Sequence, residues 1–173
     1  MNIFLTDDME KQLELFKVEK DYLNGAEFSM AGSYRYVLWR IWDDTKPKIM
    51  FIGLNPSTAD SNNPDPTITR VCSFAKQWGY GGIFMLNLFT IISPDPKALR
   101  NCPDRDRKAD KFLQIYHYLV QRVVFCWGNF KESKERAKDV IRMFPDAYCL
   151  KKNKDGSPRH PLYVKDDTEL IKF

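Results

Sequence analysis

Residues 48–57 read KIMFIGLNPS, and this stretch decides the fold of the chain. Residues 48–54 are almost continuously apolar, which predicts a strand that is covered on both faces of a sheet. Asn55, Pro56 and Ser57 follow at once and end the strand. All three are candidates to contact a substrate, and the alternative is a polar turn in which Asn55 and Ser57 bond to the backbone. A strand of this kind lifts the side chain of Asn55 onto the rim of the sheet, where a ligand can reach it.

Strands and helices alternate on both sides of this stretch. Composition and periodicity predict strands over residues 34–42, 48–54, 83–89, 122–127 and 146–150. Helices are expected over residues 7–23, 66–78, 104–120 and 129–143. This order predicts an α/β fold with three layers, α/β/α, around a mainly parallel central sheet of four to five strands.

The length of 173 residues suits a single domain with its own core. We expect residues 1–33 to form an acidic, helical N-terminal extension and residues 34–173 to form the α/β core. Residues 1–33 hold seven acidic and three basic residues, a net charge of −4, which leaves +8 for the rest of a chain whose net charge is +4. A basic core suits a polyanionic partner such as nucleic acid or a nucleotide. An ordinary solvated surface accounts for the charge equally well.

Composition disfavours several classes of protein. No apolar run approaches the roughly 20 residues that cross a bilayer, and the first residues lack a signal-type core, so we expect no membrane association and a cytoplasmic location. The four cysteines lack the close spacing of a metal-ligand pair. We expect Cys126 and Cys149 to be buried, reduced thiols. No metal and no cofactor is expected, and the oligomeric state is left open.

Three asparagines fall at or near the carboxyl ends of the predicted strands, where parallel sheets bind ligands. They are Asn55, Asn87 and Asn129. Asn87 interrupts an apolar run, and a buried amide is costly unless it is paired, so it recognises a ligand or bonds to neighbouring backbone. Asn129 either contacts a ligand or caps the next helix in a capping box with Glu132.

Residues 65–70, DPTITR, begin the helix that follows the first asparagine. The free N–H groups of a helix start can bind an anion. Asp65 is a candidate cap, Thr67 lies in the first turn, and Arg70 lies about one turn further in and can add a phosphate contact. The alternative interpretation is a capped helix with an arginine on its surface.

Residues 155–164, DGSPRHPLYV, place His160 in a polar loop stiffened by prolines. Because His160 is not on an apolar face, it is a candidate to transfer a proton or to stabilise a developing anion. Arg159 and Tyr163 are candidate contacts for phosphate and base. The alternative is an isolated surface histidine. The other histidine, His117, lies within a predicted helix and is expected to be structural.

The motifs YRYVLWRIW, FIGLNPSTAD, DPTITRV, WGYGG, NLF, WGN and KDGSPRHPLY resemble those of the domain of unknown function 1643, a family of bacterial and phage proteins. The resemblance covers about residues 33–165. In the order of its motifs, the chain is also remotely similar to the uracil-DNA glycosylase superfamily. Mismatch-specific members of that superfamily have a strand that ends in G-x-N-P, and here Gly53, Asn55 and Pro56 fit. The similarity implies a uracil-DNA-glycosylase-like fold.

This second resemblance also implies roles for the matching residues. Asn55 would position the water that attacks the sugar carbon, and Asn87 would read the edge of the base. His160 and Pro161 match a loop that stabilises the leaving base. Leu162 stands where those enzymes have a serine, so the resemblance does not carry over the phosphate contact made by that serine.

Three functions are compatible with these residues. The first is a nucleobase-directed hydrolase that cleaves an N-glycosidic bond. Its site needs a held water, a donor aimed at the base oxygen and an aromatic stacking surface. Asn55 and His160 are the catalytic candidates, and the stacking candidates are Phe89, Tyr80 and Trp127.

The second function is a module that binds a base, a nucleotide or nucleic acid in the same cleft without catalysis. The third is a different nucleotide-processing enzyme on the same scaffold. Thr58, Asp60 and Asp65 lie close to Asn55 in the sequence, and two acids in one loop are able to hold Mg²⁺, although solvated acids are the commoner case.

Overall fold

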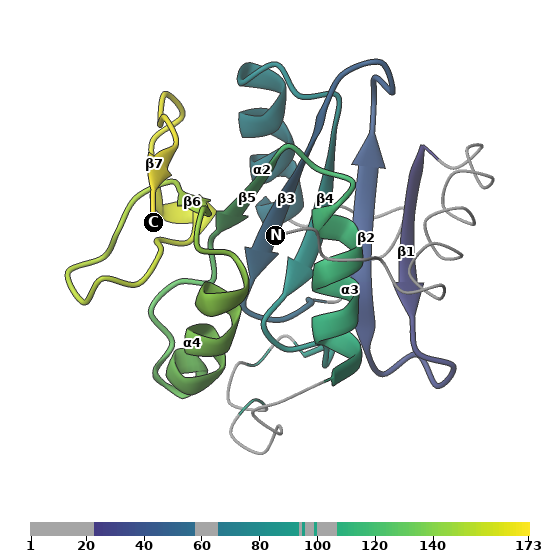
Figure 1. Cartoon of the computed structure of the whole chain (residues 1–173), viewed down its shortest axis with the longest axis vertical. Coiled ribbons are helices and arrows are strands. Elements are labelled where there is room, and N and C mark those ends of the chain that lie inside the picture. The colour runs from purple at the N-terminus through teal and green to yellow at the C-terminus, as the bar shows by residue number, and fades with distance from the viewer. Residues whose placement is uncertain (1–22, 58–65, 94, 96–98, 100–106) are drawn as a thin grey trace.

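A computed structural model describes residues 23–57, 66–93, 95, 99 and 107–173. Within these residues, seven strands form one sheet in the order β1-β2-β4-β3-β5-β6-β7 (Figure 1). The strands are β1 (Asn24–Phe28), β2 (Arg35–Ile41), β3 (Lys48–Gly53), β4 (Gly82–Asn87), β5 (Arg122–Phe125), β6 (Tyr148–Cys149) and β7 (Ile171–Lys172). The central block β4-β3-β5-β6 is parallel, whereas β1, β2 and β7 pair antiparallel with their neighbours.

The observed sheet corrects part of the predicted fold. It is mixed and has seven strands, whereas a mainly parallel sheet of four to five strands was expected. The predicted strand over residues 34–42 forms β2, but β2 lies antiparallel beside β4. The additional strands β1 and β7 are short and largely exposed, so they carry little of the apolar pattern by which a strand is recognised in sequence.

Part of the expected helical extension belongs to the sheet. Residues 24–28 form β1, in which Ala26 lies opposite Leu38 of β2. A hairpin turn joins the two strands, and within it the N–H of Gly32 donates to the carbonyl of Ser29 at 2.9 Å. The helix predicted over residues 7–23 lies outside the described residues, except for its last position.

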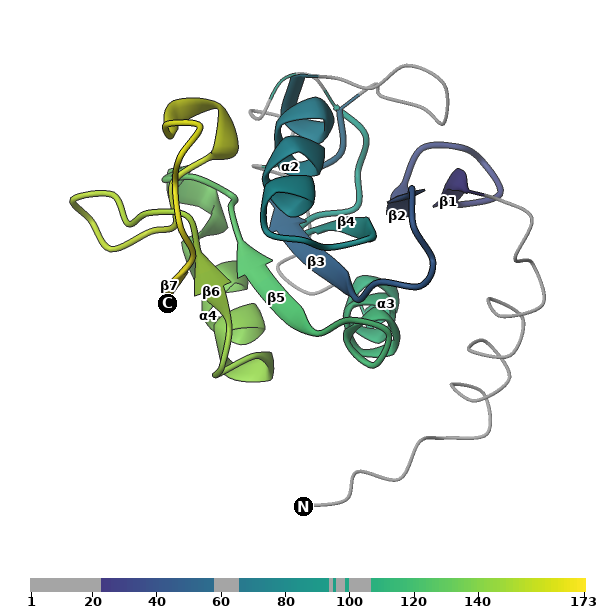
Figure 2. The ribbon, with the colours of Figure 1, turned by 90° about the horizontal axis from the view of Figure 1, so that it is seen from above.

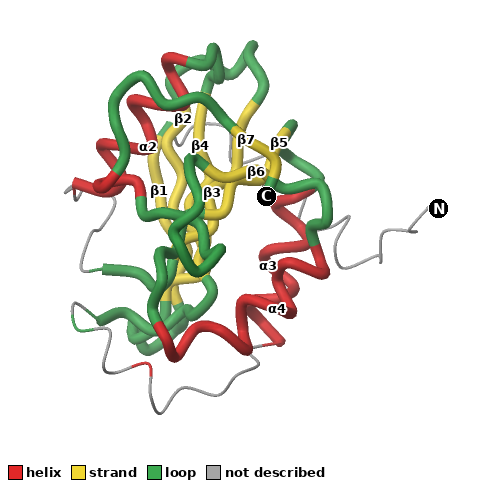
Figure 3. The backbone as a smooth tube through the Cα atoms, turned by 90° about the vertical axis from the view of Figure 1, so that its left-hand side faces the viewer, coloured by secondary structure: helices red, strands yellow, loops and turns green. Residues whose placement is uncertain are grey.

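Helices cover both faces of the sheet, as the three-layer prediction requires. Helix α2 (Pro66–Gln77) packs on one face, and helices α3 (Arg107–His117) and α4 (Lys134–Met143) pack on the other (Figures 2 and 3). On the α2 side, Val71 and Phe51 belong to one buried cluster. On the other side, Phe112 of α3 stacks on Tyr36 of β2 with ring centroids 4.8 Å apart.

The start of α4 differs from the predicted capping box. A short 3-10 helix over residues 131–133 precedes α4, and Ser133 occupies the N-cap position without a side-chain cap. Asn129 and Glu132 therefore do not cap this helix as a pair.

Arg136 ties α4 to the exit of β4 and to α3. Its side chain is 1% exposed, and its Nε–H donates to the carbonyl of Leu88 at 2.9 Å. Its guanidinium also forms an ion pair with Asp110 at 2.5 Å. Leu88 directly follows Asn87, so this buried link holds the backbone at the place where β4 presents its asparagine.

Two further expectations concern burial. Cys126 and Cys149 are both 0% exposed, which confirms the prediction of buried cysteines. In the part of the chain that the structure describes, no helix is long and apolar enough to cross a membrane.

Candidate functional site

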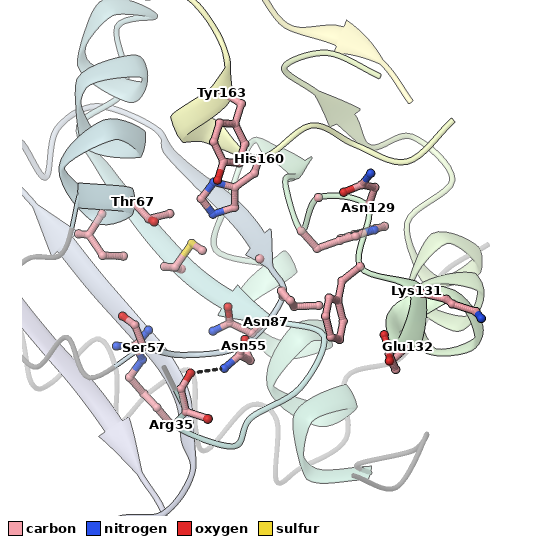
Figure 4. Close-up of a pocket in the computed structure, with 18 residues that line it drawn as sticks. Arg35, Asn55, Ser57, Thr67, Asn87, Asn129, Lys131, Glu132, His160 and Tyr163 are labelled. Atoms are coloured by element: carbon pink, nitrogen blue, oxygen red, sulfur yellow. Dashed lines mark hydrogen bonds between the residues drawn. The ribbon is translucent and has the colours of Figure 1, made fainter. Parts of the chain in front are cut away.

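A pocket of about 540 Å³ lies at the carboxyl ends of β3, β4 and β5 (Figure 4). This is the edge at which parallel sheets bind ligands. Two distant segments meet there, because the stretch after β3 and the loop around His160 line the same pocket. Eight candidate residues from the sequence contribute to its wall, and they are Asn55, Ser57, Thr67, Asn87, Trp127, Asn129, His160 and Tyr163.

Asn87 is the most unusual side chain of this pocket. It is the last residue of β4 and is 3% exposed. Both polar atoms of its carboxamide, Nδ2 and Oδ1, are buried without a hydrogen-bond partner among the residues that the structure describes. An unpaired buried amide destabilises a fold by about 1–3 kcal/mol per unsatisfied group. Because Asn87 lies in the pocket wall, a molecule that enters the pocket can reach this carboxamide.

Gly53 makes room for this amide. Gly53 and Asn87 are register partners in the parallel pair β3–β4. A Cβ at position 53 would lie 2.9 Å from Oδ1 of Asn87 and 2.6 Å from Cε of Met85. Only glycine therefore leaves both side chains where they are. The absence of a side chain at position 53 allows the Asn87 amide to take its observed position.

We expect Gly53→Ala to displace the Asn87 amide and to weaken ligand binding at least tenfold. The added methyl group overpacks the strand pair and lowers the free energy of unfolding by about 1–3 kcal/mol. Calorimetric titration of the variant and of the parent protein with a base or nucleotide measures the loss of affinity. The double variant with Asn87→Leu should bind no worse than Asn87→Leu alone, because both changes act on one group. Additive losses would contradict this account.

Asn55 is held at the rim by its own amide nitrogen. The Nδ2 group donates to the carbonyl of Ser93 at 2.8 Å and to the carbonyl of Pro56 at 3.1 Å. These bonds fix the orientation of the carboxamide, so its Oδ1 remains as the acceptor that a ligand or water can use. Figure 4 shows Asn55 next to Asn87 in the pocket.

His160 points into the pocket from the opposite wall (Figure 4). It is the N-cap of the 3-10 helix η3 (Pro161–Tyr163), and its Nδ1 accepts from the N–H of Leu162 at 3.4 Å. A neutral imidazole with an acceptor at Nδ1 carries its proton on Nε2. The tautomer favoured by this contact is therefore a hydrogen-bond donor at Nε2.

Gly128 lets the two loops around His160 pack together. It has a φ of +82°, which favours glycine. A Cβ there would lie 3.7 Å from Cβ of His160, and the N–H of Gly128 donates to the carbonyl of Pro158 at 2.9 Å. The loop after β5 thus supports the loop that carries the histidine.

Arg70 does not face the pocket as a phosphate contact. Its guanidinium donates to the carbonyls of Pro161, at 3.5 Å, and Val164, at 2.6 Å, and pairs with Asp166. It also lies 4.6 Å above the ring centre of Phe74. Arg70 therefore joins α2 to η3 and positions the segment that follows His160.

Other candidates also lie away from the pocket wall. The Nε–H of Arg159 donates to Asn153 at 3.1 Å, outside the pocket. Pro56 is buried beside the pocket and accepts the N–H of Ser93 through its carbonyl. Phe89 is 5% exposed within the main core. Asp65 lies outside the described residues, and so do Thr58 and Asp60.

Trp127 is the aromatic candidate that lines the pocket, whereas Tyr80 and Phe89 do not. Trp127 is 3% exposed and lies against Phe125, with ring centroids 4.6 Å apart. Its fixed position makes it suited to contact a flat ligand. Tyr163 is 74% exposed at the pocket edge and 5.7 Å from the ring of His160.

Three charged lining residues were missed from the sequence, namely Arg35, Lys131 and Glu132. Arg35 is 2% exposed although it begins strand β2. The signal is a basic residue inside the aromatic run YRYVLWRIW, and such a run indicates a strand without indicating a site. Lys131 and Glu132 belong to the short helix that replaces the predicted capping box.

The described thiols are poor nucleophiles. Burial raises the pKa of Cys72 to about 11 and raises the pKa of Cys126 further still. Both groups therefore stay protonated near neutral pH, and neither lines the pocket. Within the described ranges, no cluster of three or more histidine, cysteine or acidic side chains is arranged to hold a metal ion.

These features define an α/β protein with a pocket at the carboxyl edge of its parallel strands. The family model described as "Protein of unknown function (DUF1643)" matches residues 35–162. The match covers well over half of the chain, so the chain belongs to this family. A search of curated proteins found no match, and neither did a search of solved structures.

Proposed function

We propose that this protein is a nucleobase-directed hydrolase that cleaves an N-glycosidic bond in DNA or in a nucleotide. The observation that carries the proposal is the buried carboxamide of Asn87 in the pocket wall, which has no hydrogen-bond partner within the described part of the chain. A carboxamide has an acceptor and a donor side by side, which matches the adjacent C=O and N–H groups on the edge of a base. A bound base would satisfy both orphaned atoms at once.

Asn55 is the proposed positioning group for the attacking water. Its Nδ2 group is held by Ser93, so Oδ1 accepts a hydrogen bond from water beside the bound base. In the reaction, the water oxygen forms a bond to the sugar carbon and the bond from that carbon to the base nitrogen breaks. The base leaves with the electron pair, and the proton of the water is transferred to the base or to solvent.

His160 is the proposed donor to the leaving base. As the sugar–base bond breaks, negative charge collects on the base, and a fixed N–H aimed at that charge lowers the barrier. The hydrogen bond from Leu162 to Nδ1 favours the tautomer with Nε2–H. Trp127 is the proposed apolar wall against which the base lies.

The remote similarity to the uracil-DNA glycosylase superfamily adds support. Its G-x-N-P and His-Pro motifs correspond to residues 53–56 and 160–161, and residues from both motifs line one pocket. That this chain shares the fold of the superfamily and its cleavage of an N-glycosidic bond is part of the proposal. Leu162, in place of a serine, is 45% exposed.

The test is release of free base from defined substrates. Oligonucleotides and nucleotides that carry uracil, mismatched thymine or modified pyrimidines are incubated with the protein, and free base is measured by mass spectrometry. Asn55→Ala and His160→Ala should each lower the rate by a factor of about 100 or more. Circular dichroism should be unchanged.

Matched controls distinguish the pocket from the rest of the molecule. Asn153→Ala and His117→Gln change the same residue types outside the pocket wall and should keep the rate within about threefold of the parent protein. If no substrate loses its base, or if the controls and the pocket variants lose activity equally, hydrolysis at this site is wrong.

A second candidate is a binding module that uses the pocket without turnover. The observation that favours it is the internal use of Arg70 and Arg159, which bond to the protein and leave fewer cations for a nucleic-acid backbone. Binding of a base or nucleotide that depends on Asn87, with no product after long incubation, would select this reading.

A further inference from the structure

Arg35 is the second buried polar side chain in the pocket wall. Arg35 is the first residue of β2. Its backbone N–H donates to the carbonyl of Thr90 at 2.9 Å, and this bond holds the backbone that carries the side chain. The residue is 2% exposed and lines the pocket. A guanidinium has five N–H donors, so Arg35 can bond to the protein and still present donors to a ligand.

Arg35 lies at one side of the pocket together with hydroxyl groups. Figure 4 shows Arg35 and Ser57 on the side opposite to Asn129 and Lys131, with Asn55 and Asn87 between them. Thr67, in the first turn of α2, lines the same side of the pocket. Hydroxyls, a guanidinium and the positive end of a helix are the groups that bind phosphate in proteins.

We propose that Arg35, Ser57 and Thr67 form an anion subsite that binds the phosphomonoester of a small nucleotide while Asn87 holds its base. This inference deepens the proposed function, on which it rests, by naming the substrate class as a nucleoside monophosphate. It predicts that the ligand spans the pocket from Arg35 to Asn87.

Burial favours a small nucleotide over a polymer. Arg35 is almost completely covered, so a phosphate that reaches it must enter the pocket together with its base. The backbone of a duplex stays at the surface, where exposed lysines and arginines contact it. A volume of about 540 Å³ lies within the range of pockets that enclose a complete small-molecule ligand.

The test compares nucleosides with their 5′-monophosphates by isothermal titration calorimetry of the full chain. The pairs carry uracil, thymine, cytosine, adenine and guanine. We expect at least one monophosphate to bind about 10- to 100-fold more tightly than its nucleoside, which is the range of a charge-assisted contact. Arg35→Gln should reduce that ratio to less than about threefold and leave the affinity for the nucleoside unchanged.

Further variants keep the test decisive if Arg35→Gln does not fold. Thr67→Val removes one hydroxyl on a half-buried residue and should lower the ratio about two- to fivefold. Arg35→Lys keeps the charge but loses the planar fork, and should retain part of the ratio. Arg159→Gln is the control, because Arg159 bonds to Asn153 outside the pocket and its loss should not alter the ratio.

Competition identifies the chemical group that is bound. Inorganic phosphate should displace the monophosphate from the parent protein and should not displace the nucleoside. A single-stranded oligonucleotide with the same base should bind more weakly than the monophosphate.

Three results would overturn the inference: equal affinity, or no binding, for every nucleoside–monophosphate pair; a ratio that persists in Arg35→Gln and Thr67→Val; or tighter binding of the oligonucleotide that depends on Arg35. These titrations measure binding and need no turnover. Release of base is tested separately with the Asn55 and His160 variants, so the phosphate subsite can be wrong while the proposed hydrolysis is right.

Discussion

Replacing Asn87 with leucine is expected to abolish ligand binding, by a factor of at least about 100, without destabilising the fold. Leucine has the same number and branching of side-chain heavy atoms, and it removes two buried polar atoms that have no partner among the described residues. Because an unsatisfied buried amide is unfavourable, the free energy of unfolding should stay the same or rise by about 1–3 kcal/mol. Urea denaturation measures stability, and calorimetric titration measures binding.

Met85→Leu is the matched control for this experiment. Met85 lies on the same strand and lines the same pocket, but it offers no polar group for base recognition. Its replacement should change stability by less than about 1.5 kcal/mol and leave affinity within about threefold. A marked loss of stability in Asn87→Leu would mean that the amide is bonded within the protein. The proposal that this amide is available to bind a ligand would then be wrong.

Replacing Arg136 with methionine is expected to cause the largest loss of stability, about 3–5 kcal/mol. The change removes the partner of the Leu88 carbonyl and leaves the Asp110 carboxylate without its buried cation. Chemical denaturation with urea measures the effect. Part of the stability should return in the double variant with Asp110→Leu, because this second change removes the carboxylate that Arg136→Met leaves without a cation.

Arg142→Met in the same helix is the control. Arg142 is paired with Asp139 at 3.2 Å, but its side chain is 74% exposed, and an ion pair of this kind contributes at most about 1 kcal/mol. Equal losses in Arg136→Met and Arg142→Met would show that burial does not set the strength of the first ion pair.

The apolar pattern of β3 and the polar residues after it were sufficient to place Asn55 at the carboxyl edge of the sheet, where the pocket lies. Asn55, Asn87 and His160 all line one pocket, as expected from strand ends that meet at one edge and a distant loop that returns to it. Strands β3 and β4 were predicted because each is a nearly continuous apolar run. Periodicity thus identified the block that carries the pocket.

The remaining features depend on tertiary contacts that a single sequence does not encode locally. Arg70 was a candidate phosphate contact or a surface arginine, but the carbonyls that it contacts lie more than ninety positions further along the chain. Arg35 was overlooked because a strand pattern gives no measure of how deeply a basic side chain is buried. The capping-box pattern at Asn129 failed because a short 3-10 turn intervenes before α4.

Arg70 has a practical consequence for the design of shortened proteins. The family match ends at residue 162, yet Arg70 contacts the carbonyl of Val164 and the carboxylate of Asp166 beyond that border. Further on, Phe173 packs against Trp127 with ring centroids 6.2 Å apart. A polypeptide trimmed to the matched region would lose the contacts of Arg70 with Val164 and Asp166, which hold the loop after His160. It would also lose the packing of Phe173 against Trp127. Soluble fragments for crystallisation should therefore extend to residue 173.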